Sequence, residues 1–117
     1  TFTGFLNNIP EVIGDLNVFL MTSKTEGLGT SILDAFASKV PVVATRAGGI
    51  PEMVVHNSTG LTAPVGDVSA LVTNVITLKN DKKLRKELVD AAYKKLDGFT
   101  KEKMAARTIQ LYKEVLN

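Results

Sequence analysis

Residues 18–38 read V-F-L-M-T-S-K-T-E-G-L-G-T-S-I-L-D-A-F-A-S, and this stretch decides the fold. Its first four residues form a continuous apolar run, which is typical of a strand that is covered on both faces. A loop with Gly27 and Gly29 follows. Residues 31–38 then have the apolar spacing of a short helix, which Thr30 or Ser31 can cap. A buried strand followed by a helix predicts a βα unit.

The same alternation continues on both sides of this unit. Further strands are predicted at residues 1–5, 40–44 and 60–63, and further helices at 10–14, 51–56 and 68–79. Two more helices are predicted after residue 80, with Thr100 as the cap of the second. We therefore predict one α/β domain over residues 1–117, with an open parallel sheet of about four strands and flanking helices.

Composition excludes several kinds of site. The chain of 117 residues has no cysteine and one histidine, His56, which excludes disulfides, a thiol nucleophile and a multi-histidine metal site. It has no Asp-x-Asp pair, so the sequence does not support a dedicated metal-diphosphate site. No apolar run approaches the roughly 20 residues that a membrane span needs.

The charges are unevenly distributed. Residues 1–80 hold four Lys or Arg and six Asp or Glu, whereas residues 81–117 hold ten and six. The net charge of +2 is too small to favour nucleic acid as a partner. The basic C-terminal part is interpreted first as the solvated faces of two helices, with contact to a membrane surface or an acidic partner as the alternative.

The loop after the 18–21 strand is the candidate site, because ligands bind at the carboxyl ends of parallel strands. Gly27 and Gly29 let a ligand approach the backbone, and the following helix offers unpaired N–H groups to a phosphate or diphosphate. The dinucleotide fingerprint fails at Ile32, and no P-loop is present. Glu26 and Asp34 flank the loop and suit neutral sugar or ribose hydroxyls; the alternative is a loop acid and a helix-dipole acid.

The ordered stretch E-G-L-G-T-S-I-L-D-A, then V-P-V-V-A, then G-G-I-P-E, resembles the C-terminal half of GT-B glycosyltransferases. It is most similar to family 4, whose members are retaining, metal-independent and use nucleotide sugars. The resemblance extends over nearly the whole chain and implies an open, Rossmann-like parallel sheet. It therefore implies a glycosyltransferase that moves a sugar from a nucleotide-diphosphate sugar to an acceptor.

The resemblance also implies residue roles. Glu26, the candidate catalytic residue, would hydrogen-bond hydroxyls of the donor sugar, and Asp34 would hold the ribose where the family has a longer Glu. The turn at Phe5 and Leu6 would lie beside the base. The backbone amides that would hold the sugar and phosphates belong to Gly27, Leu28, Gly29, Thr30 and Ser31.

We expect the chain to be part of a longer protein. In the family, an Arg and a Lys bind the diphosphate, and both come from a region that this sequence does not contain. The N-terminal acceptor-binding domain of the family is absent from this sequence as well. The expected consequences are an isolated chain that is inactive and that associates with itself. The resemblance separately implies that no metal is required. We expect a cytoplasmic protein, with peripheral contact to the inner face of a membrane as a further hypothesis. The rival functions are a non-catalytic nucleotide-sugar binding module and a GT-B-like epimerase.

Overall fold

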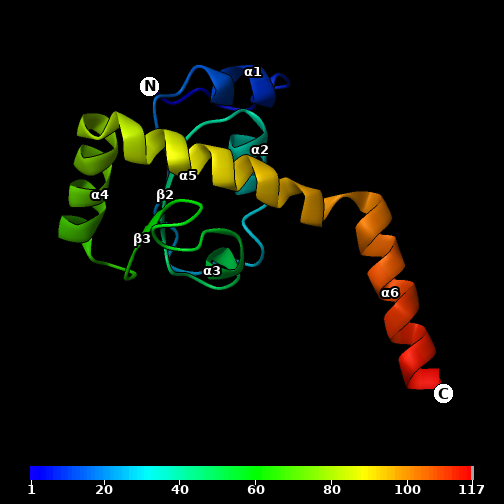
Figure 1. Cartoon of the computed structure of the whole chain (residues 1–117). Coiled ribbons are helices and arrows are strands. Elements are labelled where there is room, and N and C mark those ends of the chain that lie inside the picture. Colours follow the sequence, from blue (N-terminus) through cyan, green and yellow to red (C-terminus); the bar gives the residue numbers. More distant parts are fainter. Residues whose placement is uncertain (117) are drawn as a thin grey trace.

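The computed structural model describes residues 1–116 (Figure 1). Within them lie three strands, β1 (Phe19–Met21), β2 (Val42–Thr45) and β3 (Leu61–Ala63). The helices are α1 (Ile9–Gly14), α2 (Ser31–Ala37), α3 (Ile50–Met53), α4 (Val68–Asn80), α5 (Lys82–Lys95), the short 3-10 helix η1 (Leu96–Phe99) and α6 (Lys101–Leu116). From residue 9 onward, the alternation of short strands and helices agrees with the prediction to within a few residues.

The strands form one parallel sheet in the order β1-β2-β3. Phe19 pairs with Val42 in the first ladder, and Val43 pairs with Leu61 in the second. Parallel neighbours need a crossover connection, which α2 and α3 provide. The predicted α/β class with an open parallel sheet is therefore confirmed.

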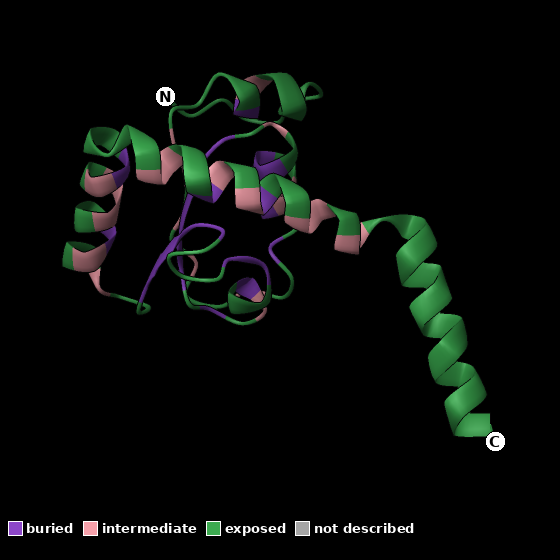
Figure 2. Ribbon diagram, viewed as in Figure 1, coloured by how far each residue is buried: buried purple, intermediate pink, exposed green. Residues whose placement is uncertain are grey.

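Helices cover both faces of the sheet, and β2 is buried along its whole length (Figure 2). Val42 and Ala44 belong to one apolar cluster with residues of α1, α2 and α5. Val43, between them, belongs to a second cluster with Leu71 and Leu78 of α4. This alternation follows from the two-residue period of a strand and explains why the run V-P-V-V-A is apolar throughout.

The strand predicted over residues 1–5 is wrong, and the sheet has three strands in place of about four. These residues form irregular backbone that pairs with no strand in the described part of the chain. Gly4 has a φ of +64°, outside the extended region, and the Phe5 side chain is 91% exposed. Because the segment buries so little apolar surface, nothing offsets the entropy cost of fixing it in a ladder.

The structure thus leaves β1 at an edge of the sheet. An apolar groove of about 540 Å³ runs between this edge and α4, lined by residues that include Leu20, Val68, Val72 and Ile76. Unpaired edges and exposed apolar surface favour association. Self-association of the isolated chain stays a prediction.

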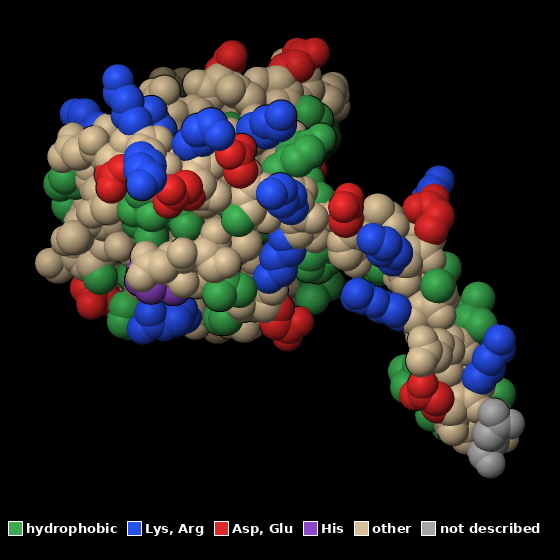
Figure 3. Space-filling model, viewed as in Figure 1, with side chains coloured by type: hydrophobic (Ala, Val, Ile, Leu, Met, Phe, Trp, Pro, Cys, Tyr) green, Lys and Arg blue, Asp and Glu red, His purple; other side chains and the backbone are tan. Residues whose placement is uncertain are grey.

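The helix α6 projects away from the body of the molecule (Figure 1). No residue of α6 is buried, including Met104, Leu111, Tyr112 and Val115 of its apolar stripe. Thr100 caps it as predicted, because its hydroxyl accepts a hydrogen bond from the Lys103 amide at 3.3 Å. Figure 3 shows Lys and Arg side chains spread over the face of α5, which agrees with solvated helix surfaces.

No helix among residues 1–116 has the length and apolar character required to cross a membrane.

Candidate functional site

The loops that follow β1 and β2 meet at the carboxyl edge of the sheet. The first loop, residues 22–30, leads into α2, and the second, residues 46–49, leads into α3. In open parallel sheets this edge is where ligands bind, because helix starts and loop amides converge there. The sequence therefore predicted the correct end of the sheet for these loops.

Two long-range hydrogen bonds hold the loops together. The Thr45 hydroxyl, on a side chain that is only 1% exposed, donates to the Ser23 carbonyl oxygen at 2.6 Å. The Gly49 amide donates to the Gly27 carbonyl oxygen at 3.0 Å. Sequence reasoning missed Ser23 and Thr45, because nothing in their spacing shows that residues 22 positions apart touch.

Gly48 and Gly49 are the reason that the loops can approach so closely. A Cβ atom added at Gly48 would lie 1.7 Å from the Glu26 carbonyl oxygen, and one at Gly49 would lie 2.6 Å from the Gly27 carbonyl oxygen. Gly48 also has a φ of +50°, a conformation that favours glycine. The structure makes them supports of the loop that carries Glu26.

The Glu26 carboxylate is held by two donors within its own loop. Its Oε2 accepts from the Ser23 hydroxyl at 3.2 Å, and its Oε1 accepts from the Gly27 amide at 3.1 Å. Each carboxylate oxygen can accept a second hydrogen bond. The side chain is therefore oriented in advance and still has lone pairs for the hydroxyl groups of a ligand.

Backbone donors gather at the start of α2. Within residues 1–116, the amides of Leu28, Gly29, Thr30 and Ser31 have no hydrogen-bond acceptor. The Gly27 amide, also predicted as a phosphate donor, is not free, because it donates to Glu26 Oε1. Gly29 adopts a φ of +61°, and α2 begins directly after it. Free amides at a helix start attract anions. Because α2 has only seven residues, these local N–H groups matter more than a long helix dipole.

The predicted cap of α2 is different in the structure. Thr30 occupies the N-cap position, but its hydroxyl makes no capping hydrogen bond. Its backbone is already helical, with φ −57° and ψ −25°, whereas a capping residue normally has extended backbone. The Ile32 and Leu33 amides, which a cap would have used, donate instead to the Gly29 and Thr30 carbonyl oxygens, both at 2.9 Å.

The other predicted site residues are placed as follows. Asp34 lies in the first turn of α2 with an exposed side chain, away from the buried positions Ile32, Ala35 and Phe36. Leu28 is 68% exposed at the tip of the loop. The structure thus brings Glu26, the glycine loop and the start of α2 into one continuous segment beside α3.

Phe5 and Leu6 are not brought to this segment. The N-terminal segment lies beside α1, at the end of the molecule opposite α3 (Figure 1). Since residues 1–5 form no strand, nothing directs the turn at Phe5 and Leu6 to the carboxyl edge. The contact with a base that the resemblance implied for these two residues is therefore not reproduced.

His56 has a structural role. Its Nδ1 accepts a hydrogen bond from the Thr62 amide at 2.9 Å, which ties the end of α3 to β3. Two cations, Lys24 and Arg46, are exposed in the loops at the carboxyl edge.

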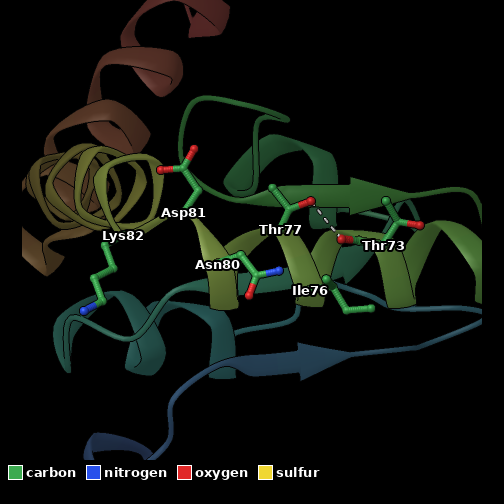
Figure 4. A pocket seen from close by; sticks show the side chains of 6 residues that line it. All are labelled: Thr73, Ile76, Thr77, Asn80, Asp81 and Lys82. Atoms are coloured by element: carbon green, nitrogen blue, oxygen red, sulfur yellow. Dashed lines mark hydrogen bonds between the residues drawn. The ribbon is translucent and has the colours of Figure 1, made fainter.

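Larger hollows lie elsewhere on the surface. One of about 710 Å³ lies at the corner between α4 and α5, lined by Thr73, Ile76, Thr77, Asn80, Asp81 and Lys82 (Figure 4). Three of its polar side chains already have partners: the Thr73 and Thr77 hydroxyls donate to the Ser69 and Thr73 carbonyl oxygens, and Asp81 caps α5 through the Leu84 amide. Within residues 1–116, no cluster of three or more His, Asp or Glu side chains could hold a metal ion.

The parallel sheet and the loops at its carboxyl edge show the class of the domain: it is a Rossmann-like α/β domain of the GT-B type, as in the solved structures that this chain resembles. Residues 1–95 match the family described as Glycosyl transferases group 1, and the chain belongs to that family.

Known relatives are similar over most of this chain. An N-acetyl-alpha-D-glucosaminyl L-malate synthase of Bacillus anthracis is 32% identical over 98% of the chain, and the match covers 30% of that relative. The Anabaena protein HepE, solved in complex with UDP, is 29% identical with a TM-score of 0.75 over 80% of this chain and 26% of its own. A glycosyltransferase of Rickettsia africae has a TM-score of 0.82 and 25% identity, over 95% of this chain and 30% of its own. The chain therefore spans about a third or less of these proteins.

Proposed function

We propose that this chain is the donor-binding part of a glycosyltransferase that transfers a sugar from a nucleotide-diphosphate sugar to an acceptor. The observation that carries the proposal is the loop between β1 and α2, where a preoriented Glu26 lies just before four free amides. Membership of the family supports it, since this loop lies inside the matched residues. The similarity to a protein solved with UDP-glucose supports a nucleotide sugar as the ligand.

Two kinds of group in the loop bind different parts of the nucleotide sugar. The amides of Gly29, Thr30 and Ser31 bind the diphosphate, and the Glu26 carboxylate accepts hydrogen bonds from sugar hydroxyls. A carboxylate repels phosphate, so Glu26 belongs on the sugar side. We assign the ribose to Asp34, whose side chain is exposed in the first turn of α2.

These donors assist the reaction through charge. When the glycosidic bond to phosphate breaks, negative charge develops on the departing diphosphate. Preorganised N–H groups stabilise that charge, and one such donor is worth about 10²–10³ in rate. We propose that the amides and the cations Lys24 and Arg46 supply this stabilisation without a metal ion, so a chelator leaves donor binding unchanged.

We further propose that the reaction retains the anomeric configuration. The Glu26 carboxylate accepts hydrogen bonds on both oxygens from within its own loop, which suits a group that orients the sugar better than a free nucleophile. Departure and attack on the same face of the sugar then need no covalent intermediate on Glu26. The anomeric configuration of the product, determined by NMR on the longer parent protein, tests this.

Transfer requires more than this chain. The relatives are about three times as long, and we propose that the part of the parent protein that binds the acceptor lies outside these residues. The isolated chain then binds a nucleotide sugar weakly and transfers none. Sugar transfer to any acceptor by the isolated 117 residues would refute this part of the proposal.

The binding experiment uses the chain as it exists. UDP-glucose, GDP-mannose and ADP-glucose are titrated by NMR against the chain and against Glu26→Ala, with the free nucleotides in parallel. We expect Glu26→Ala to weaken binding of the nucleotide sugar and to leave binding of the free nucleotide unchanged. Glu11→Ala, an exposed acid in α1, is the matched control. If no nucleotide shifts any resonance of residues 26–31, the site assignment is wrong.

A further inference from the structure

Lys95 joins two elements that are distant in the sequence. It lies in the last turn of α5, and its Nζ donates hydrogen bonds to the carbonyl oxygens of Glu52 and, at 3.1 Å, Met53. Both carbonyls belong to the last two residues of α3, more than 40 positions earlier. Most lysines of α5 extend into solvent, but Lys95 is partly buried.

The end of α3 needs such a partner. This helix has four residues, so its final carbonyls have no intrahelical donors and carry the negative end of a dipole. A lysine ammonium is a favourable partner for these groups. The Met53 carbonyl oxygen also accepts from the Thr59 hydroxyl at 2.9 Å, so the end of α3 is fixed from two directions.

The other end of α3 touches the donor loop, which is the loop of residues 23–31. Gly49 precedes Ile50 directly, and its amide donates to the Gly27 carbonyl oxygen. A Cβ at Gly29 would lie 3.4 Å from Ile50 Cγ1, which shows how closely α3 approaches the loop. Because four helical residues extend only about 6 Å, a movement at the Lys95 end reaches Gly49.

A cavity between α3 and the donor loop also shows that the two are close. Glu52 and Gly49 line a cavity of about 160 Å³ together with Leu28 and Thr30 of the donor loop. Burial lowers the pKa of Lys95, and the Glu52 carboxylate partly opposes that effect. The lysine head group is therefore held against α3 and partly withdrawn from water.

We propose that Lys95 is a positioning residue of the nucleotide-sugar site: by binding the carbonyl end of α3, it keeps Gly49 against Gly27 and so fixes the donor loop. This rests on the proposed function for its ligand. Lys95 touches no ligand itself and acts through α3. If it only attached α5 to the body of the molecule, its loss would lower stability and leave the geometry of the donor loop unchanged.

The experiment compares Lys95→Met with Lys95→Arg in the 117-residue chain. Methionine keeps most of the apolar stem and removes the donors, whereas arginine keeps a cation with N–H groups. Lys94→Met, an exposed neighbour in the same turn, is the control. Two quantities are measured at 25 °C: the amide resonances of Gly27, Gly29 and Gly49 without ligand, and the Kd for UDP.

In Lys95→Met we expect the Gly49 amide proton to move upfield as its bond to Gly27 weakens, and UDP binding to weaken roughly 2- to 30-fold, the range for indirect coupling. Lys95→Arg is expected to restore both values, and Lys94→Met to keep both. If Lys95→Met does not fold, Lys95→Gln, whose shorter side chain reaches the carbonyls less well, is assessed in the same way.

Folded Lys95→Met with Gly27 and Gly49 resonances equal to those of Lys94→Met would overturn the positioning role. The two proposals fail separately. If the unmodified chain binds no UDP, the proposed function fails, but the glycine resonances without ligand still decide whether Lys95 positions the loop.

Discussion

Substituting Gly48 with alanine tests the link between the two loops. The added Cβ would lie 1.7 Å from the Glu26 carbonyl oxygen, so the loops must separate. Alanine at the φ of +50° costs about 1–2 kcal/mol. Losing the adjoining Gly49–Gly27 hydrogen bond adds about 0.5–1.5 kcal/mol. We expect Gly48→Ala to lower the free energy of unfolding by about 2–4 kcal/mol, the sum of these two costs plus loop rearrangement.

Gly66→Ala is the matched control for this substitution. Gly66 has a φ of +85°, but nothing lies within 4 Å of the position of its Cβ. Gly66→Ala is therefore expected to lower the free energy of unfolding only by the cost of the left-handed backbone conformation, about 1–2 kcal/mol. Urea unfolding followed by circular dichroism gives both values, and NMR titration gives the affinity for UDP. If Gly48→Ala is no more destabilising than Gly66→Ala, or binds UDP equally well, the proposed support of Glu26 by Gly48 is refuted.

Three further predictions concern α6, the ribose contact and a surface ion pair. Ending the chain at Thr100 removes a helix without buried residues and is expected to shift the Tm by less than about 4 °C in a thermal scan, equivalent to under about 1 kcal/mol; a loss of cooperative unfolding would contradict this. Asp34→Glu, with one more methylene, is expected to strengthen UDP binding, and Asp34→Ala to weaken it; equal Kd values for all three chains would remove Asp34 from the site. Lys86 lowers the pKa of Asp90, mainly through their hydrogen bond, and Asp90 raises the pKa of Lys86, so the pair stabilises the fold above the ordinary aspartate pKa and loses that effect as pH falls through the lowered value. At alkaline pH the stabilisation is lost as the pH rises past the raised pKa of Lys86. The pKa of Asp90 is measured by a carboxyl ¹³C titration, and the same pKa in Lys86→Met would contradict this prediction.

Local pattern was sufficient for most of the fold. The apolar runs at residues 18–21 and 40–44 predicted β1 and β2. Only β2 is covered on both faces, as such a run is expected to be; in β1, at the edge of the sheet, Leu20 is 49% exposed. Helical spacing predicted α4 and α5 in the same way. Residues 1–5 show the limit of this reasoning, since a strand forms only where another strand offers a partner.

The site was predicted in part for a similar reason. The glycine loop and Glu26 lie close in sequence, so their pattern was visible. The long-range contacts were not visible, since Thr45, Gly49 and Lys95 donate hydrogen bonds to residues 22 to 43 positions away. Spacing along a chain carries no information on contacts between separate loops. Only the folded arrangement identifies which glycines are structural necessities.

One measurement addresses the central claim directly: a titration of the ¹⁵N-labelled chain with UDP, followed through the backbone amides. We expect the largest shifts at Gly29, Thr30 and Ser31, whose N–H groups are free without ligand, and we expect Glu26→Ala to leave these shifts in place. Saturable shifts confined to another part of the chain, or none at these three amides at millimolar UDP, would contradict it.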